Sequence, residues 1–141
     1  MKILLPVDGS DCALRAVEHL IVHGNWFRDL PEIHLLHVHA PIPIGRIQAY
    51  VGNETLHAYY QEESQAQLSE AQKKLDAAGY IYTTHIHVGQ PAEVVGKIAS
   101  ELACDLILMG THGRSGIAGL VMGSVASRVL HLAACPVLLV K

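Results

Sequence analysis

The chain has 141 residues, of which 50% are hydrophobic and 16% are charged, so its size and composition suit one globular domain over residues 1–141. Its net charge of −3 and its lack of a basic tract argue against nucleic-acid binding. No apolar run approaches the roughly 20 residues of a membrane span. Three cysteines without C-x-x-C spacing argue against a disulfide framework or a zinc knuckle, and we expect a cytoplasmic protein.

Strand and helix patterns alternate from the start of the chain. The continuous apolar run 3–7 is typical of a strand that is covered on both faces. Ser10 can cap the next helix, whose apolar stripe has i, i+3, i+4 spacing and which Gly24 is expected to end as a C′ glycine. The run 33–38 predicts the second strand, and the long connection 40–55 follows it.

The second half of the chain continues this alternation. Gly79 is expected to end one helix, Pro91 suits the first position of the next, and Pro136 breaks the last. Five strands with helical crossovers predict an α/β fold, an open parallel sheet with helices on both faces. The predicted ranges are a helix over 54–78, a strand over 80–88, a helix over 91–102, a strand over 106–109, a helix around 121–130 and a strand over 137–140.

The glycine-rich stretch 110–124, G-T-H-G-R-S-G-I-A-G-L-V-M-G-S, lies between the fourth predicted strand and the last helix. Open α/β sheets build phosphate sites this way, because glycines admit close backbone approach and the amides at a helix N-terminus attract anions. Ser124 is expected both to cap the helix and to donate to phosphate, while His112 and Arg114 can add positive charge. Neither a Walker A motif nor a G-x-G-x-x-G fingerprint is present. The stretch predicts a site for a nucleotide or another phosphate compound.

Four segments of the chain together resemble the universal stress protein family. They are P-V-D-G-S at 6–10, L-L-H-V at 35–38, G-Q-P-A-E-V-V at 89–95 and the G-x2-G-x9-G-S motif that begins at Gly110, and the C-terminal P-V-L-L-V completes the likeness. The resemblance covers nearly the whole chain and implies a Rossmann-like sheet with the strand order 3-2-1-4-5. It also implies the ATP-binding branch of the family, with a divalent ion such as Mg²⁺ or Mn²⁺ held through the phosphates.

The resemblance also implies a role for each matching residue. Asp8 would serve the adenine–ribose end, the main chain of Val38 would meet the adenine edge, and Gly89 would lie beside the ribose or base. Asp8, Val38, Gly89 and Gly110 also fall at the carboxyl ends of predicted strands, and these ends share the edge where ligands bind. Gly110 and Gly113 are expected to leave space for the phosphates. The predicted nucleotide site comprises Pro6, Val7, Asp8, Val38, Gly89, Met109, Gly110, His112, Gly113, Arg114, Gly123, Ser124 and Val125, and no residue is assigned to catalysis or to a metal.

The histidines leave two interpretations open. His37 and His39 share one face of the second predicted strand, and His85 and His87 share one face of the third. The four imidazoles could therefore meet near the nucleotide edge as a metal or pH-sensing site. We favour the alternative, in which they are separate, half-buried strand residues with main-chain or water partners.

Two segments bear on partners. The connection 40–55 is either a lid or contact surface, with Arg46 in reach of phosphate, or a loop packed on its own domain. The last strand, 137–140, is expected to form an apolar sheet edge, and the family resemblance implies a homodimer through antiparallel pairing of this edge.

The leading functional hypothesis is a stress-response sensor or adaptor. ATP would bias loops near the site, and an unknown client protein, such as a membrane transporter, would respond to the ordered form. The alternative is a slow ATPase or adenylyl-transferring enzyme, although no second acid near the glycine-rich stretch supports efficient turnover. A flavin or AMP module with similar topology is a third reading.

Overall fold

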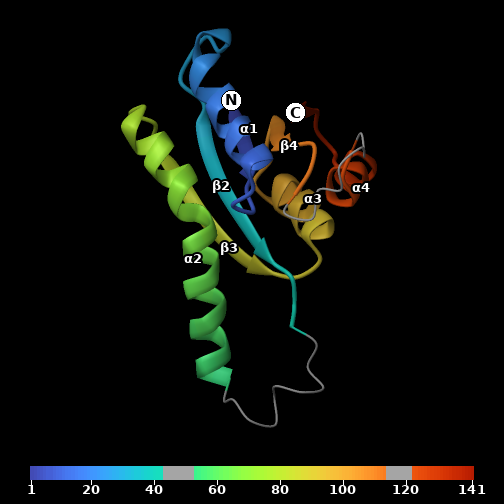
Figure 1. Ribbon diagram of the computed structural model, residues 1–141. Coiled ribbons are helices and arrows are strands. Elements are labelled where there is room, and N and C mark those ends of the chain that lie inside the picture. The colour runs from blue at the N-terminus through green and yellow to red at the C-terminus, as the bar shows by residue number, and fades with distance from the viewer. Residues whose placement is uncertain (43–52, 114–121) are drawn as a thin grey trace.

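The computed structural model describes residues 1–42, 53–113 and 122–141, which form one layered α/β unit (Figure 1). Its elements are β1 (Lys2–Pro6), α1 (Asp11–Val22), the 3-10 helix η1 (Gly24–Trp26), β2 (Glu32–His39), α2 (Asn53–Ala77), β3 (Tyr82–Val88), α3 (Pro91–Glu101), β4 (Leu106–Gly110), α4 (Ser124–Leu132) and β5 (Val137–Val140). All strand pairs are parallel, and the sheet has the order β3-β2-β1-β4-β5. The predicted fold class and strand order are therefore confirmed.

Strand β1 lies at the centre of the sheet because it pairs with both β2 and β4. Ile3 is in register with Ile33 on one side and with Leu106 on the other. The N–H of Val7 continues this pairing beyond β1 by donating to the carbonyl of Leu36 over 2.8 Å. The parallel register brings the carboxyl ends of the strands to one edge of the sheet, which is where ligands bind in open α/β folds.

Alternating side chains of the strands build a separate core on each face of the sheet. One core packs against α1 and α2 and contains Ile3, Leu5, Ile33, Leu35, Ala16, Val17, Leu20, Leu68 and Leu75. The other packs against α3 and α4 and contains Leu4, Leu36, Ile107, Met109, Val95, Ile98, Ala126 and Val129. Because successive residues of a strand point to opposite faces, neighbours such as Leu35 and Leu36 belong to different cores.

The helix ends mostly follow the predicted signals. The Ser10 side chain accepts from the N–H of Ala13 over 3.2 Å, and Pro91 is the first residue of α3. Gly79 has φ +74° after α2, as its predicted role requires. Gly24 differs from expectation, since it begins η1 and is not among the described residues with positive φ. The chain continues there as a 3-10 turn, in which Trp26 N donates to the carbonyl of His23 over 2.9 Å.

Candidate functional site

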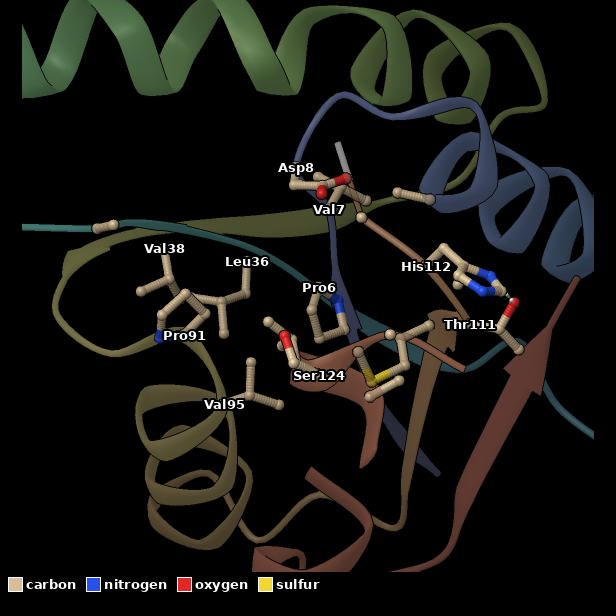
Figure 2. A pocket seen from close by; sticks show the side chains of 18 residues that line it. Pro6, Val7, Asp8, Leu36, Val38, Pro91, Val95, Thr111, His112 and Ser124 are labelled. Carbon is tan, nitrogen blue, oxygen red and sulfur yellow. Dashed lines mark hydrogen bonds between the residues drawn. The ribbon is translucent and has the colours of Figure 1, made fainter. Parts of the chain in front are cut away.

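A cavity of about 540 Å³ opens at the carboxyl edge of the sheet, beside β1, β2 and β4 and the first turns of α3 and α4 (Figure 2). Its volume lies within the range of about 300–1,000 Å³ that is typical of small-molecule sites. The lining residues are Pro6, Val7, Asp8, Ala13, Leu36, Val38, Ala40, Pro91, Val95, Met109, Gly110, Thr111, His112, Gly113, Gly123, Ser124, Val125 and Ala126. One connected space therefore joins segments from both halves of the chain.

One wall of the cavity is apolar. Leu36 and Val38 contribute to it from β2, and Pro91 and Val95 face them from α3 (Figure 2). Leu36 and Val95 are buried, while Val38 and Pro91 are partly exposed toward the opening. Such a wall can bury an apolar part of a ligand away from water, and these side chains form no hydrogen bonds with it.

Asp8 supplies a carboxylate at the cavity, two residues after the end of β1 (Figure 2). Its Oδ1 accepts hydrogen bonds from the Ser10 N–H over 3.1 Å and from the Ser10 hydroxyl over 2.6 Å. Gly9, between the two, has φ +77°, a conformation that favours glycine. The D-G-S turn therefore both orients the Asp8 carboxylate and positions the cap of α1.

The beginning of α4 also lines the cavity. Four consecutive residues, 123–126, line it there. The first N–H groups of a helix lack carbonyl partners within the helix and carry partial positive charge, so this side favours an anion. Gly123, and not Ser124, is the N-cap, and it has no side-chain cap bond. The expectation that Ser124 caps α4 was wrong, because Ser124 is already the first helical residue and is exposed.

The glycines differ in what they make room for. A Cβ on Gly110 would lie 2.7 Å from the carbonyl carbon of Cys12 and 2.8 Å from its oxygen. Gly110 therefore permits α1 to pack closely on β4, a role that sequence analysis did not foresee. A Cβ on Gly113 would instead lie 2.6 Å from Asp8 Oδ2, so this glycine keeps the loop close to the carboxylate. Gly123 is similarly tight, with 3.1 Å to the carbonyl oxygen of Thr111.

A polar group connects the cavity to the last strand. Thr111 is buried, and its hydroxyl lies 2.9 Å from His112 Nδ1 and 3.6 Å from the Cys12 sulfur. The Cys12 thiol donates to the carbonyl of Val140 over 3.3 Å. Burial raises the pKa of the Cys12 thiol, but hydrogen bonds from the His112 backbone and from Thr111 outweigh it, and the net pKa is lowered.

Most of the predicted site residues line this cavity, with two exceptions. Gly89 does not line it; its N–H donates to the His39 carbonyl over 3.0 Å and extends the pairing of β3 with β2. Arg114 lies outside the described residues, as do the segments 43–52 and 114–121, so the lid hypothesis and Arg46 stay predictions. The lining residues that sequence analysis missed are Ala13, Leu36, Ala40, Pro91, Val95, Thr111 and Ala126. Most are apolar, and in the sequence they look like ordinary core positions.

The four histidines singled out from the sequence do not converge. His37 points to the α1–α2 side, where its Nδ1 lies 2.8 Å from the Val7 carbonyl oxygen. His85 is in register with Leu36 and His87 with Val38, which puts both on the opposite face of the sheet. Burial, followed by the neighbouring His34 and His87, lowers the pKa of His85. In the described parts of the chain, no three His, Cys, Asp or Glu side chains are placed to hold a metal together.

The fold and the cavity define an open α/β domain with a cavity at the carboxyl edge of its sheet. The sequence profile described as "Universal stress protein family" matches residues 1–141, so the chain belongs to that family. Universal stress protein MJ0531 of Methanocaldococcus jannaschii is 35% identical over 99% of this chain and 81% of its own length. The solved structure of MJ0577, from the same organism, has a TM-score of 0.84 and 31% identity, covering 99% of this chain and 94% of that one.

A further solved relative is informative about ligands. It is a universal stress protein in complex with cAMP, with a TM-score of 0.70 and 25% identity, covering 100% of this chain and 97% of the relative.

Among the described residues, no helix is both long enough and apolar enough to cross a membrane.

Proposed function

We propose that this chain binds ATP in the cavity at the carboxyl edge and acts as a regulatory sensor or adaptor. The observation that carries the proposal is a single cavity whose lining combines an apolar wall on β2 and α3 with the N-terminus of a helix. An adenine nucleotide has the matching chemistry, a flat base at one end and phosphates at the other. The cAMP complex of a relative at 25% identity supports the same ligand class.

The residues suggest how the nucleotide would lie. The apolar side chains of Val38, Pro91 and Val95 would contact the base, and the Asp8 carboxylate would accept from ribose hydroxyls. The first amides of α4, at Ser124 and Val125, would donate to phosphate oxygens. A Mg²⁺ or Mn²⁺ ion would be held through the phosphates, where it neutralises their charge.

The chemistry of the cavity lining supports the sensor role. Its polar groups would bind and orient a ligand, and Asp8 Oδ1 already accepts hydrogen bonds from Ser10. A ligand of this kind regulates by stabilising one conformation over another, which a client protein such as a membrane transporter would distinguish. ATP turnover faster than about 1 per second, the lower end of ordinary enzyme rates, would contradict this role.

The proposal includes a homodimer through β5. This strand is an edge of the sheet, and its side chains, Val137–Val140, are apolar and only partly buried within the chain. An unpaired apolar edge favours antiparallel pairing with a second copy about a two-fold axis. Sedimentation equilibrium would give twice the chain mass; a monomer at tens of micromolar protein would contradict the dimer.

The sharpest test of ATP binding adds a negative charge where the phosphates are expected. Ser124→Asp places a carboxylate in the first turn of α4. The helix dipole stabilises a negative side chain there, but this side chain repels phosphate. Isothermal titration calorimetry should show ATP affinity reduced by about tenfold or more, because like charges in contact cost several kcal/mol. Ser124→Ala, which removes only the hydroxyl, should have a smaller effect.

A matched control separates this local repulsion from a general effect of charge. Ser69→Asp introduces the same carboxylate at a partly exposed position on α2, away from the cavity lining. Ser69→Asp should bind ATP like the unmodified chain. Equal affinities in the unmodified chain, Ser124→Asp and Ser69→Asp would place the nucleotide elsewhere, and no binding by the unmodified chain would refute the proposed function.

A further inference from the structure

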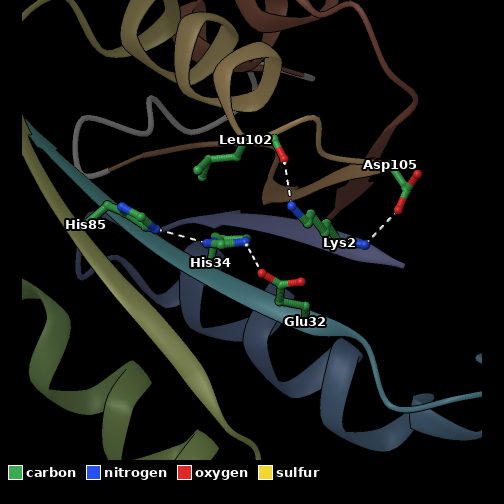
Figure 3. A network of polar contacts seen from close by, with 6 residues as sticks. All are labelled: Lys2, Glu32, His34, His85, Leu102 and Asp105. Carbon is green, nitrogen blue, oxygen red and sulfur yellow. Dashed lines mark hydrogen bonds and ion pairs between the residues drawn. The ribbon is translucent and has the colours of Figure 1, made fainter.

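Two histidines meet on the α3–α4 face of the sheet, away from the nucleotide cavity. His34 Nδ1 on β2 lies 3.0 Å from His85 Nε2 on β3, and His34 Nε2 lies 3.1 Å from Glu32 Oε1 (Figure 3). His34 is buried, with 5% of its surface exposed, while His85 is partly exposed. None of the three residues lines the cavity, so the proposed nucleotide site leaves this group unexplained.

The partners determine where the protons lie. A carboxylate oxygen accepts hydrogen bonds, so a neutral His34 ring with Glu32 as partner carries its hydrogen on Nε2 and presents a lone pair at Nδ1. His85 Nε2 must then donate to that lone pair. A single proton therefore lies between His34 Nδ1 and His85 Nε2. If this proton moves from His85 Nε2 to His85 Nδ1, each of the two facing nitrogens presents a lone pair.

Two converging imidazole nitrogens are the usual ligands of late first-row divalent metals. With Zn–N bonds of about 2.0–2.1 Å, tetrahedral coordination separates neighbouring nitrogens by about 3.3 Å. The observed 3.0 Å between His34 Nδ1 and His85 Nε2 is close to this value. Because the two nitrogens face each other in the hydrogen bond, each ring would turn by about 35° to direct its lone pair at an ion beside the N···N line. The exchange of the proton for an ion therefore requires a change of ring orientation, while the separation of the two nitrogens changes little.

The carboxylate on the far side of His34 fits the same chemistry. Metal-binding histidines commonly donate their other N–H to a carboxylate, which fixes the tautomer and makes the ligand more basic. Glu32 is in this position, and its side chain is 57% exposed, so it is in contact with solvent. The Lys2 ammonium nearby is directed to the Leu102 carbonyl, 3.2 Å away, and not to Glu32 (Figure 3).

We infer that His34 and His85 form a binding site for a zinc-like divalent transition metal, with Glu32 positioning His34. His87 follows on the same face of β3, but the described residues contain no three ligands already in place, so water completes the coordination. The bound ion would cross-link β3, the edge strand, to β2. The inference is independent of the proposed function, since nucleotide binding can fail while the metal site holds, and the reverse.

The direct test is a zinc titration of the full chain, prepared without an affinity tag or nucleotide and treated with EDTA. Calorimetry should show one saturable zinc site per chain. His85→Gln, on the edge strand, should weaken zinc binding by tenfold or more, and Glu32→Gln should weaken it about 10–100-fold. His131→Gln is the matched control, because His131 is exposed on α4 and its Nδ1 contacts the Ser127 carbonyl of its own helix. This control should bind zinc like the unmodified chain.

A second measurement avoids the risk that a variant of the buried His34 does not fold. In the unmodified chain, long-range ¹H–¹⁵N spectra of the imidazoles should show His34 as the Nε2–H tautomer. Zinc should shift His34 Nδ1 and His85 Nε2 together and leave His131 unchanged. Absence of saturable binding, or binding that His85→Gln leaves intact, would overturn the inference and identify the group as a structural hydrogen-bond chain.

Discussion

The two faces of the sheet use the same five strands, yet they are covered differently. On the α1–α2 face, side chains such as Leu35 and Leu75 are fully buried, and α2 reaches over both β2 and β3. The α3–α4 face has an apolar core over β1 and β4, but a cavity opens at its carboxyl end and the His34–His85 pair lies over β2 and β3. The cavity and the histidine pair therefore both involve the α3–α4 face of the sheet.

The largest expected effect is on the free energy of unfolding. It should come from shortening Leu35 or Leu36, adjacent residues of β2 that face opposite sides of the sheet. Leu35→Ala should lower the free energy of unfolding by about 2–5 kcal/mol, because it leaves a void in a closed core. Leu36→Ala should cost less, because the space it opens joins the existing cavity, where water can enter. Urea unfolding measures both, and only Leu36→Ala should alter ATP affinity. Equal costs would mean that the two faces are packed alike.

The next expected effect is on stability and ATP affinity, at Gly110, the last residue of β4, and at Gly113, three residues later. Gly110→Ala should destabilise the fold by about 1–3 kcal/mol, because the added carbon meets the Cys12 backbone, which cannot move freely. Gly113→Ala meets the Asp8 carboxylate, a side chain that can rotate, so it should cost less stability and more ATP affinity. Thermal unfolding and ATP calorimetry on both variants distinguish the roles. If Gly110→Ala instead lowered mainly ATP affinity, Gly110 would leave space for the phosphates, as expected from the sequence.

A smaller effect is expected from pH at His19 on α1. Burial, followed by the neighbouring His23, lowers the pKa of His19 below its ordinary value of 6.5. The unfolded chain then binds a proton at His19 at a higher pH than the folded chain does, so stability falls as pH decreases through 6.5 toward the lowered value. Urea unfolding between neutral and mildly acidic pH should show a shallower loss in His19→Gln than in the unmodified chain. Identical slopes would exclude His19 as a source of the loss.

The smallest effect is spectroscopic and concerns Tyr82, on the α2 side of β3. Burial, and then the hydrogen bond of 2.9 Å from its hydroxyl to Asp76 Oδ1, raise the pKa of Tyr82 to about 12. Of the five tyrosines, Tyr82 should therefore be among the last to ionise in an ultraviolet titration. Asp76→Asn should lower this pKa only in part, because burial is the larger cause. A titration unchanged by Asp76→Asn would remove the carboxylate from the explanation.

Local signals explain why so much of the fold was predictable. Ser10, Gly79 and Pro91 act through backbone geometry and hydrogen bonds within a few residues, so their roles are visible in the sequence. Strand β3 begins at Tyr82, two residues later than predicted, because the Tyr80 N–H still donates to the Leu75 carbonyl of α2 over 3.0 Å. Apolar runs locate a strand well, but hydrogen bonds between elements decide its first residue.

The candidate site was predictable only in part, for a similar reason. Asp8, Gly113 and Gly123 were found because motifs mark them, whereas Leu36 and Val95 line the cavity with side chains that look like core. The histidine prediction named His85 but not its partner. In the register of β2 and β3, His34 lies opposite Thr83, so His85, two residues further along β3, is its diagonal neighbour on the same face. A single sequence does not contain that register.

The sequence by itself determined the alternation of strands and helices, the family and the edge of the sheet where a ligand would bind, because these depend on periodicity and on local turn chemistry. The tertiary structure decided that Gly110 serves the packing of α1, that the cavity wall is apolar, and that His34 pairs with His85. Each of these depends on atoms that are distant in the chain and come together only when the strands pair and the helices pack.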